Sequence, residues 1–250
     1  MNKDSVNIEY FGAAACKITT VKGRTIVIDP YIRKNPLCTA SPDDFLNADI
    51  ILVSHGASDH LGDTVEIMKN SDATLICGSD VSNYCLEMGI LKQRIRTTVY
   101  GDLKEFDGVS VKTLYAQHVS MVKSETQTYY GRPMGFMITT ENRIRILHTG
   151  DTSLFGDMRL FGMLHKPNVL LIGISRVDDG NVIEMNPSEA ALATLWLTPD
   201  VVLPMHYPPA SDDPGKFLEA VKIIAPNVQP LVIQPNSHVI FTKYHLDISN

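Results

Sequence analysis

Runs of β-forming residues dominate the first quarter of the chain. Val, Ile, Thr, Tyr and Phe cluster in short segments bounded by Gly, Pro, Asn or Asp, which is the pattern expected of strands. The predicted strands here are residues 6–12 (VNIEYFG), 16–21 (CKITTV), 25–30 (TIVIDP) and 49–55 (DIILVSH).

Helical and strand patterns alternate through the rest of the chain. The segment Asn186-Pro187-Ser188-Glu189 places a capping residue before a proline at the first helical position and predicts a helix over 187–196. Helices are also expected at 62–70 and 80–89. The remaining strands are expected at residues 74–78 (TLICG), 108–116, 134–140 (MGFMITT), 143–149 (RIRILHT), 168–174 (NVLLIGI), 200–206 (DVVLPMH), 231–235 (LVIQP) and 238–242 (HVIFT).

This order of elements predicts an α/β (α+β) fold. Many strands, with helices interposed mainly in the later part, favour two sheets flanked by helices. No segment repeats at a period of 20–50 residues, and no low-complexity stretch or linker interrupts the chain. We therefore expect one domain over residues 1–250.

The composition narrows the classes of function. The net charge of −6 argues against a nucleic-acid or anionic-membrane partner held by bulk electrostatics. The longest apolar runs, such as VLLIGI at 169–174, are too short to span a bilayer. The N-terminal MNKDSVNIEYFG lacks the apolar run of a signal peptide. We expect a cytoplasmic protein that acts on a small molecule, and a homo-oligomer on base rates alone.

Four cysteines are present, and none forms a C-x-x-C pair with another. They are Cys16, Cys38, Cys77 and Cys85. This low density does not indicate a disulfide framework, so we expect reduced thiols, mostly buried. One disulfide stays open as an alternative because connectivity cannot be read from a sequence.

The segment SHGASDHLGD at residues 54–63 carries the first candidate chemistry. It follows the predicted strand DIILV, so His55, Asp59 and His60 lie together in one turn where side chains can converge. Imidazole nitrogen and carboxylate oxygen suit zinc, and also manganese or iron. This spacing alone is a weak signal, since it also arises by chance or at a capped helix start.

Three other predicted strands end in the same kind of residue. His118 follows VKTLYA, Asp151 lies in LHTGDT at 147–152, and His206 lies in VLPMHYP at 202–208. Each of these alone is more often a hydrogen-bonded residue at a strand end. Four strands that each deliver His or Asp at their C-terminal ends predict a coordination sphere.

This order of motifs resembles the metallo-β-lactamase fold family of metal-dependent hydrolases, from Asp29 in VIDPY to His206. HLGD at 60–63, HTGDT at 148–152, NPSEA at 186–190 and PMHY at 204–207 are similar to the branch that contains L-ascorbate-6-phosphate lactonase. The resemblance implies a four-layer αββα sandwich, with the metal ions at one edge. The ordered motifs are specific for the fold and unspecific for the substrate.

The resemblance also implies a first metal site at His55, His118 and Asp151. In the family this site has a further histidine two positions after His55, but this chain has Ala57 there. A methyl group cannot donate a lone pair, so the first site should bind its ion more weakly and be partly filled or empty. Three ligands still suffice for an open zinc site.

The second metal site that the resemblance implies is complete. It would use Asp59, His60 and His206, with Asp151 bridging to the first site. Asp29 corresponds to a carboxylate that orients one ligand histidine through its other ring nitrogen. We expect one or two ions per chain, zinc first and Mn²⁺ or Fe²⁺ as alternatives, and the second site to fill before the first.

The predicted reaction is hydrolysis by water that the metal activates. A bound cation lowers the pKa of water towards about 7 and polarises the scissile carbonyl or phosphoryl oxygen. Asp59 and Asp151 would hold the metal and the nucleophile, and either can accept a proton. An incomplete first site weakens the two-metal clamp, which favours a small lactone, ester or amide over a phosphodiester. Anionic or phosphorylated compounds of these kinds are included in this prediction.

Two loops offer candidates for substrate contact. Residues 119–133 form a polar segment. One interpretation is a flap in which Lys123 and Arg132 bind an anionic substrate. The favoured interpretation is a solvated connecting loop. Arg176 is a rim candidate of similar weight. Tyr207 is a candidate for stabilising an oxyanion, although a packed tyrosine is the commoner case.

Two alternatives to the hydrolase stay open. A binding or sensing module that has lost part of its site is supported by Ala57 and opposed by six matching positions, because buried His/Asp clusters are costly without a metal. A phosphodiesterase or nuclease on the same fold is opposed by Ala57 and the acidic balance. A redox enzyme would need a Glu in the His-rich turn and a flavin domain, which this chain lacks.

Overall fold

The two ends of the chain meet in one mixed sheet. The computed structural model describes residues 4–175, 184–242 and 246–249. Strand β1 (Ser5–Gly12) pairs antiparallel with β2 (Ala15–Thr19) on one side and with the C-terminal β16 (Ser237–Thr242) on the other. The sheet order is β17 (Leu246–Ser249), β16, β1, β2, β3 (Thr25–Ile28), β4 (Ile50–Val53), β5 (Thr74–Cys77) and β6 (Ile95–Thr97).

A second mixed sheet is built from the middle of the chain. Its order is β15 (Gln229–Pro230), β14 (Val201–Met205), β13 (Val169–Gly173), β12 (Arg145–His148), β11 (Met134–Thr139), β8 (Val109–Tyr115) and β7 (Leu103–Phe106). Neighbours from β12 to β15 run parallel, as do those from β3 to β6 in the first sheet. Parallel strands are covered on both faces, which explains why IILV and VLLIG are apolar throughout.

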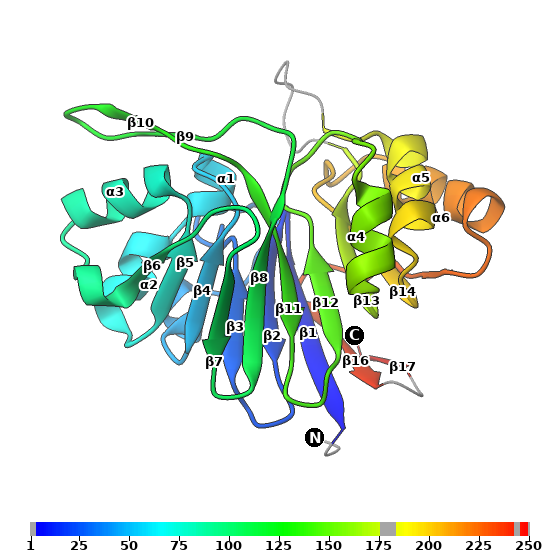
Figure 1. Cartoon of the computed structure of the whole chain (residues 1–250), viewed down its shortest axis with the longest axis horizontal. Helices are drawn as coiled ribbons and strands as arrows, with labels where there is room; N and C mark the ends of the chain where they lie inside the picture. Colours follow the sequence, from blue (N-terminus) through cyan, green and yellow to red (C-terminus); the bar gives the residue numbers. More distant parts are fainter. Residues whose placement is uncertain (1–3, 176–183, 243–245, 250) are drawn as a thin grey trace.

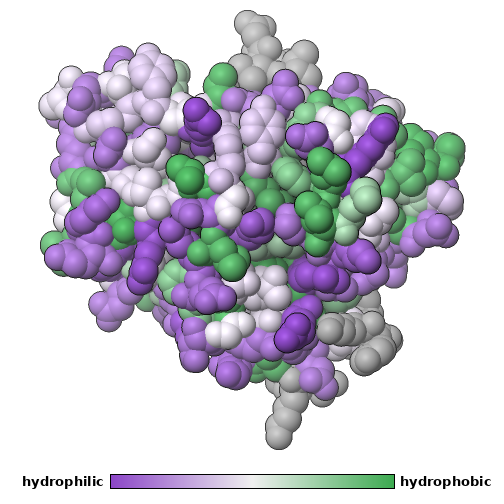
Figure 2. Space-filling model, in the orientation of Figure 1, coloured by the Kyte–Doolittle hydropathy of each residue, from purple (hydrophilic) through white to green (hydrophobic). Residues whose placement is uncertain are grey.

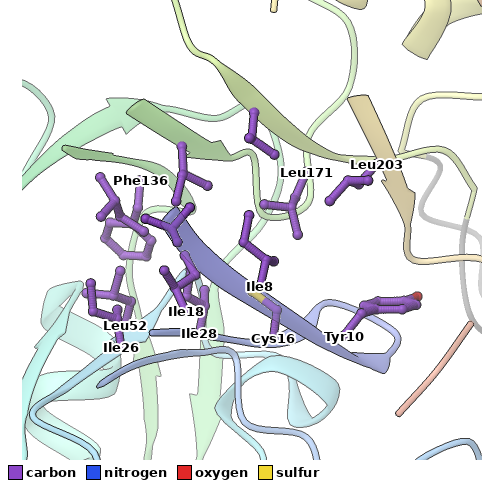
Figure 3. Close-up of a cluster of buried hydrophobic side chains, with 14 of the residues drawn as sticks. Ile8, Tyr10, Cys16, Ile18, Ile26, Ile28, Leu52, Phe136, Leu171 and Leu203 are labelled. Atoms are coloured by element: carbon purple, nitrogen blue, oxygen red, sulfur yellow. The ribbon is translucent and has the colours of Figure 1, made fainter. Parts of the chain in front are cut away.

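The two sheets face each other, and helices cover their outer faces (Figure 1). Side chains of both sheets, including Ile18, Phe136 and Leu171, form the central core (Figure 3). Separate apolar clusters lie beneath α2 (Thr64–Asn70) and α3 (Ser79–Glu87), and beneath α4 (Met158–His165), α5 (Pro187–Leu197) and α6 (Asp213–Ile224). The predicted four-layer αββα arrangement is confirmed.

Helix α5 begins where its capping sequence predicts. The Asn186 side chain accepts hydrogen bonds from the backbone N–H groups of Ser188 and Glu189, each at 3.0 Å. Glu189 returns the interaction by accepting from the Asn186 backbone N–H at 3.0 Å. This capping box satisfies the free donors of the first turn.

Several elements differ from the expectation. Residues 231–234 are irregular, because the last strand of the second sheet is the short β15, which contains Pro230 and so has one ladder donor fewer. Helix α4 was not predicted because Leu160, Met163 and Leu164 leave apolar residues on its solvent side. Figure 2 shows hydrophobic surface, coloured green, on the right-hand side of the molecule. Helix α6, the strands β6, β7 and β17, and the short helices η1 (Pro42–Phe45) and η2 (Lys92–Arg94) were not predicted either.

Residues 119–133, for which a flap and a solvated connecting loop were both considered, contain a β-hairpin. Its strands are β9 (Met121–Lys123) and β10 (Thr128–Tyr130), which pair antiparallel and extend over α3 (Figure 1). Tyr129 Oη donates to Glu87 Oε2 at 2.8 Å and Thr126 Oγ1 donates to Glu87 Oε1 at 2.6 Å. These bonds to α3 order the segment, and most of its side chains remain exposed to solvent.

The state of the cysteines and the lengths of the helices agree with what the sequence predicts. All four cysteines are free thiols, and Cys16, Cys77 and Cys85 are buried. Among the helices of the described residues, none has the length and apolarity that crossing a membrane requires.

Candidate metal centre

The turn after β4 holds the first three candidate side chains. The chain passes through His55 into the four-residue helix α1 (Ser58–Leu61), which carries Asp59 and His60. The turn closes at Gly62, where φ is +46° and an added Cβ would lie 2.2 Å from the carbonyl oxygen of Pro30. Only glycine fits this close approach. In the HLGD motif, the glycine is therefore required by sterics, and the histidine is a candidate ligand.

Three loops from the second sheet meet this turn. His118 follows β8, Asp151 follows β12 and His206 follows β14. Gly150 has a φ of +57°, and a Cβ there would lie 2.7 Å from the Cβ of Ser54. The glycine therefore lets the loop of Asp151 pack directly against the end of β4.

The predicted residues of the second site form a compact group. His60 Nε2 lies 3.3 Å from His206 Nε2 and 3.1 Å from Asp151 Oδ2. His206 Nε2 lies 3.4 Å from Asp151 Oδ2 and 3.4 Å from Asp59 Oδ2. Zinc–ligand bonds of about 2.0–2.2 Å place the ligand atoms of one ion roughly 3 to 4 Å apart, so these spacings fit a single ion.

The predicted residues of the first site are also adjacent. His55 Nε2 lies 3.8 Å from Asp151 Oδ2, and His118 Nε2 lies 3.9 Å from the same oxygen. One ligand atom from each of the three lies within 4.8 Å of the others. Asp151 Oδ2 is thus shared between the two groups, and the structure brings all six predicted side chains together.

The donor atoms at this centre suit a cation. His55 and Asp151 are only 2% and 3% exposed, yet His55 Nε2 and Asp151 Oδ1 have no hydrogen-bond partner among the described residues. A buried polar atom without a partner is costly, and a buried carboxylate more so. A metal ion bound by these lone pairs would remove that cost, so the residues present fit a metal.

Asp29 and Ser54 orient the histidines from behind. Asp29 Oδ2 accepts a hydrogen bond from His60 Nδ1 at 2.8 Å and another from Ser54 Oγ at 2.7 Å. Ser54 Oγ also lies 3.1 Å from His55 Nδ1. With both Nδ1 atoms occupied, both Nε2 atoms face the centre.

Electrostatics keep His55 and Asp151 in their metal-binding forms. By contrast, the Asp151 carboxylate, against the effect of burial, raises the pKa of His60 and of His206, which must each lose a proton to bind a metal. Burial, together with the neighbouring His60, lowers the pKa of His55 to about 3, so its imidazole is neutral. Burial raises the pKa of Asp151, but His206 and His60 outweigh it and hold the pKa well below the ordinary value. A neutral imidazole and an ionised carboxylate are the forms that donate lone pairs to a metal.

Family comparisons agree with this geometry. Residues 24–207 match the Beta-lactamase superfamily domain. The chain belongs to the metallo-β-lactamase superfamily. It is 38% identical over 230 residues to a UPF0173 metal-dependent hydrolase of Methanosphaera stadtmanae, covering 91% of this chain and 93% of that protein. It is 35% identical over 238 residues to the UPF0173 metal-dependent hydrolase of Methanobrevibacter smithii, covering 93% and 96%.

Solved structures of the superfamily have the same fold. Igni18, a metallo hydrolase of Ignicoccus hospitalis, is 30% identical with a TM-score of 0.80, covering 95% of this chain and 98% of that one. YhfI of Bacillus subtilis is 14% identical with a TM-score of 0.69, covering 95% and 100%, and shows the fold alone. This member of the superfamily is a metal-dependent hydrolase.

Ala57 opens this hydrolase towards a cavity of about 510 Å³. The cavity is lined by Ala57 together with His55 and His118, so it reaches the first site directly. Lys34 and Lys123 line it as well, and both are exposed. A methyl group at position 57 leaves open space where a larger side chain would stand.

The other predicted contact residues of the hydrolase lie elsewhere. Arg132 lines a separate cavity of about 260 Å³ and its guanidinium lies 5.9 Å from the Tyr100 ring centroid, so only Lys123 of the predicted pair lines the cavity beside His55 and His118. Tyr207 is 8% exposed and packs in the core beneath α5 and α6. Arg176 lies outside the described residues.

Glu184, immediately before α5, is a residue of the centre that the sequence did not reveal. It is 7% exposed, and its Oε1 lies 3.8 Å from His118 Nε2. Burial and the adjacent Asp151 carboxylate raise the pKa of Glu184. It lies two residues before the NPSEA motif but is not part of it, and it does not follow a predicted strand directly, so only the fold could bring it here.

A buried carboxylate links the loops of the first site. Ser120 Oγ donates a short hydrogen bond to Asp80 Oδ2 and accepts one from the Gly56 backbone N–H at 3.0 Å. Gly56 follows His55 and Ser120 is two residues from His118. Asp80, at the start of α3, therefore fixes both loops relative to each other.

Proposed function

We propose that this hydrolase opens a small lactone, ester or amide that carries an anionic group. The observation that carries the proposal is the cavity beside His55 and His118, because a substrate there is in reach of the metal centre and of Lys34 and Lys123. Such a site has concave walls and a few convergent polar groups. The similarity of HLGD and HTGDT to the lactonase branch points to the same substrate class.

We assign the metal ligands as two sets that share Asp151. Asp59, His60 and His206 hold one ion with it, at spacings of 3.1 to 4.0 Å. The first site, at His55, His118 and Asp151, receives no donor from Ala57. We expect the second site to fill first and the first site to bind more weakly, with zinc as the preferred ion and manganese or iron as alternatives.

The ion and the side chains have separate roles in the reaction. When bound, the ion supplies a Lewis acid that polarises the scissile carbonyl and lowers the pKa of water to about 7. The Asp59 side chain is 30% exposed and that of Asp151 only 4%. Asp59 is therefore the more accessible of the two carboxylates, so we assign to it the role of proton acceptor and to Asp151 that of holding the centre together.

The walls of the cavity support a substrate with an apolar body. Leu61, Tyr84 and Met121 line it, together with Lys34 and Lys123. The salt bridges among the described residues engage neither lysine. An acyl compound with a carboxylate or phosphate would match this combination of apolar wall and free cation.

The first test is elemental analysis of metal per chain, on protein purified without a metal-affinity tag, beside an Asp59→Ala control. One or two equivalents of zinc, manganese or iron, reduced in the control, support the ligand assignment. Absence of metal even after reconstitution contradicts it.

The second test is turnover. The reconstituted protein is assayed on matched lactones, esters and amides with and without a carboxylate or phosphate. Metal-dependent hydrolysis that prefers the anionic members supports the proposal. Metal binding without turnover of any of them favours a binding module, the function that Ala57 would otherwise suggest.

A further inference from the structure

The first site is one donor short of a closed set. Its predicted ligands are His55, His118 and Asp151, and Ala57 offers only a methyl group. Zinc in a protein takes four ligands in most structural sites and three plus water in catalytic ones. Any further donor aimed at these atoms would therefore change how tightly the ion binds.

Glu184 lies at the distance such a donor requires. Its Oε1 is 3.8 Å from His118 Nε2, the same spacing as that of His55 Nε2 from Asp151 Oδ2. A carboxylate oxygen of Glu184 also lies within 4.8 Å of a ligand atom of Asp151, which the two sites share, and of a ring nitrogen of His206, which belongs to the second site. A separation of 3.8 Å is too long for a hydrogen bond, so these groups do not bond one another directly. The spacing fits atoms that share a third partner between them.

Glu184 is also buried and unsatisfied. The residue is 7% exposed, and its Oε2 has no hydrogen-bond partner among the residues that the structure describes. It shares this property with Asp151 Oδ1 and His55 Nε2 of the first site. A buried carboxylate that faces another carboxylate needs a positive charge nearby, and a divalent ion supplies it.

We propose that Glu184 is an additional protein ligand of the first site. It takes the place of the histidine that the family has at position 57, where this chain has alanine. The proposal rests on the proposed function only in requiring that the centre binds metal. The proposed ligand lies outside the sequence motifs. Its chemistry is suitable, because carboxylate oxygen binds zinc as imidazole nitrogen does. Glu184 is not among the residues that line the cavity at Ala57, so this role leaves the cavity free for the substrate.

The test is calorimetric titration of the metal-free full-length chain with Zn²⁺, for the native protein and for Glu184→Gln and Glu184→Ala. Native protein should bind two equivalents in two steps. Both variants should keep the first step and weaken the second by more than about 100-fold, beyond what loss of an outer hydrogen-bond partner costs. Retention of the first step shows that the variants are folded.

Two further variants sharpen the result. Glu219→Gln, a change at an exposed position of α6, is the matched control and should bind like the native chain. The double change Ala57→His with Glu184→Gln should restore the second step, since the histidine supplies the missing donor.

The outcomes separate this proposal from the one on which it rests. A second step in Glu184→Gln and Glu184→Ala that stays within twofold of the native value overturns the role of Glu184 and leaves the hydrolase proposal intact. Loss of both steps overturns it too, because Glu184 would then not be specific to the first site. A native chain that binds no zinc overturns the metal assignment itself.

Discussion

His60 Nδ1 donates a hydrogen bond of 2.8 Å to Asp29 Oδ2, and both side chains are fully buried. This bond turns His60 Nε2 towards Asp151 and raises the basicity of the ring. Asp29 occupies a left-handed backbone conformation with φ of +47°, which asparagine also tolerates. Asp29→Asn is therefore a change of charge at nearly constant shape.

We expect Asp29→Asn to weaken metal binding at the second site by about 10- to 100-fold, because the amide orients His60 without a negative charge. Isothermal titration with zinc measures the effect. Unchanged affinity would show that the Asp29 charge is not needed at the second site.

The position of Asp151 predicts that substitutions at Asp151 and at His118 remove different numbers of metal ions. Its Oδ2 lies between 3.1 and 3.9 Å from Nε2 of all four histidines. Asp151→Ala should therefore lose both ions, whereas His118→Ala should lose only the ion of the first site. Elemental analysis of the two variants decides this, and one full equivalent retained in Asp151→Ala would contradict a shared ligand.

Metal should stabilise the fold. Binding to the native state alone contributes about 2.7 kcal/mol when free ligand is 100 times its Kd. For a chain of this size, this corresponds to a rise in Tm of about 5 to 10 °C. Thermal unfolding with zinc and with chelator measures the difference. Asp151→Ala serves as the control and should show no response to chelator.

Asp80 should matter for stability and for the first site. Asp80→Ala leaves the buried Ser120 hydroxyl without its acceptor, and we expect a loss of about 1–3 kcal/mol in the free energy of unfolding. Urea denaturation measures this loss. The second site takes Asp59 and His60 from the turn of Gly56 but no side chain from the loop of Ser120, so its zinc affinity should fall less than that of the first site. Equal weakening of both sites would show that Asp80 acts on the whole centre.

Lys123 should affect binding of anionic substrates more than their turnover. Lys123 lines the cavity but is exposed, so its contribution to binding an anion is that of a surface ion pair, about 0.2–1 kcal/mol. Lys123→Gln should raise KM for an anionic ester by up to about five-fold and leave kcat and the neutral analogue unchanged. Arg132→Gln is the comparison, since Arg132 lines the other cavity and should have no effect.

The strands could be predicted because the order of apolar and polar residues within each strand indicates which of its faces are buried. Continuous apolar runs such as VLLIG identify strands covered on both faces, and the capping box at Asn186 locates the start of α5. Helix α4 and the hairpin of β9 and β10 could not, because Met163 and Leu164 are exposed and the hairpin depends on Glu87 of another element. Local pattern carries no information on a contact between distant segments.

The sequence by itself determined which strand ends carry His and Asp, the glycines that their turns require, and the departure at Ala57. Those features are local, since each follows from a few consecutive residues. Only the tertiary structure decided that one oxygen of Asp151 lies between both groups of histidines and that Glu184 stands beside His118. Packing of two sheets against each other sets those distances, and spacing along a chain does not encode separations across such an interface.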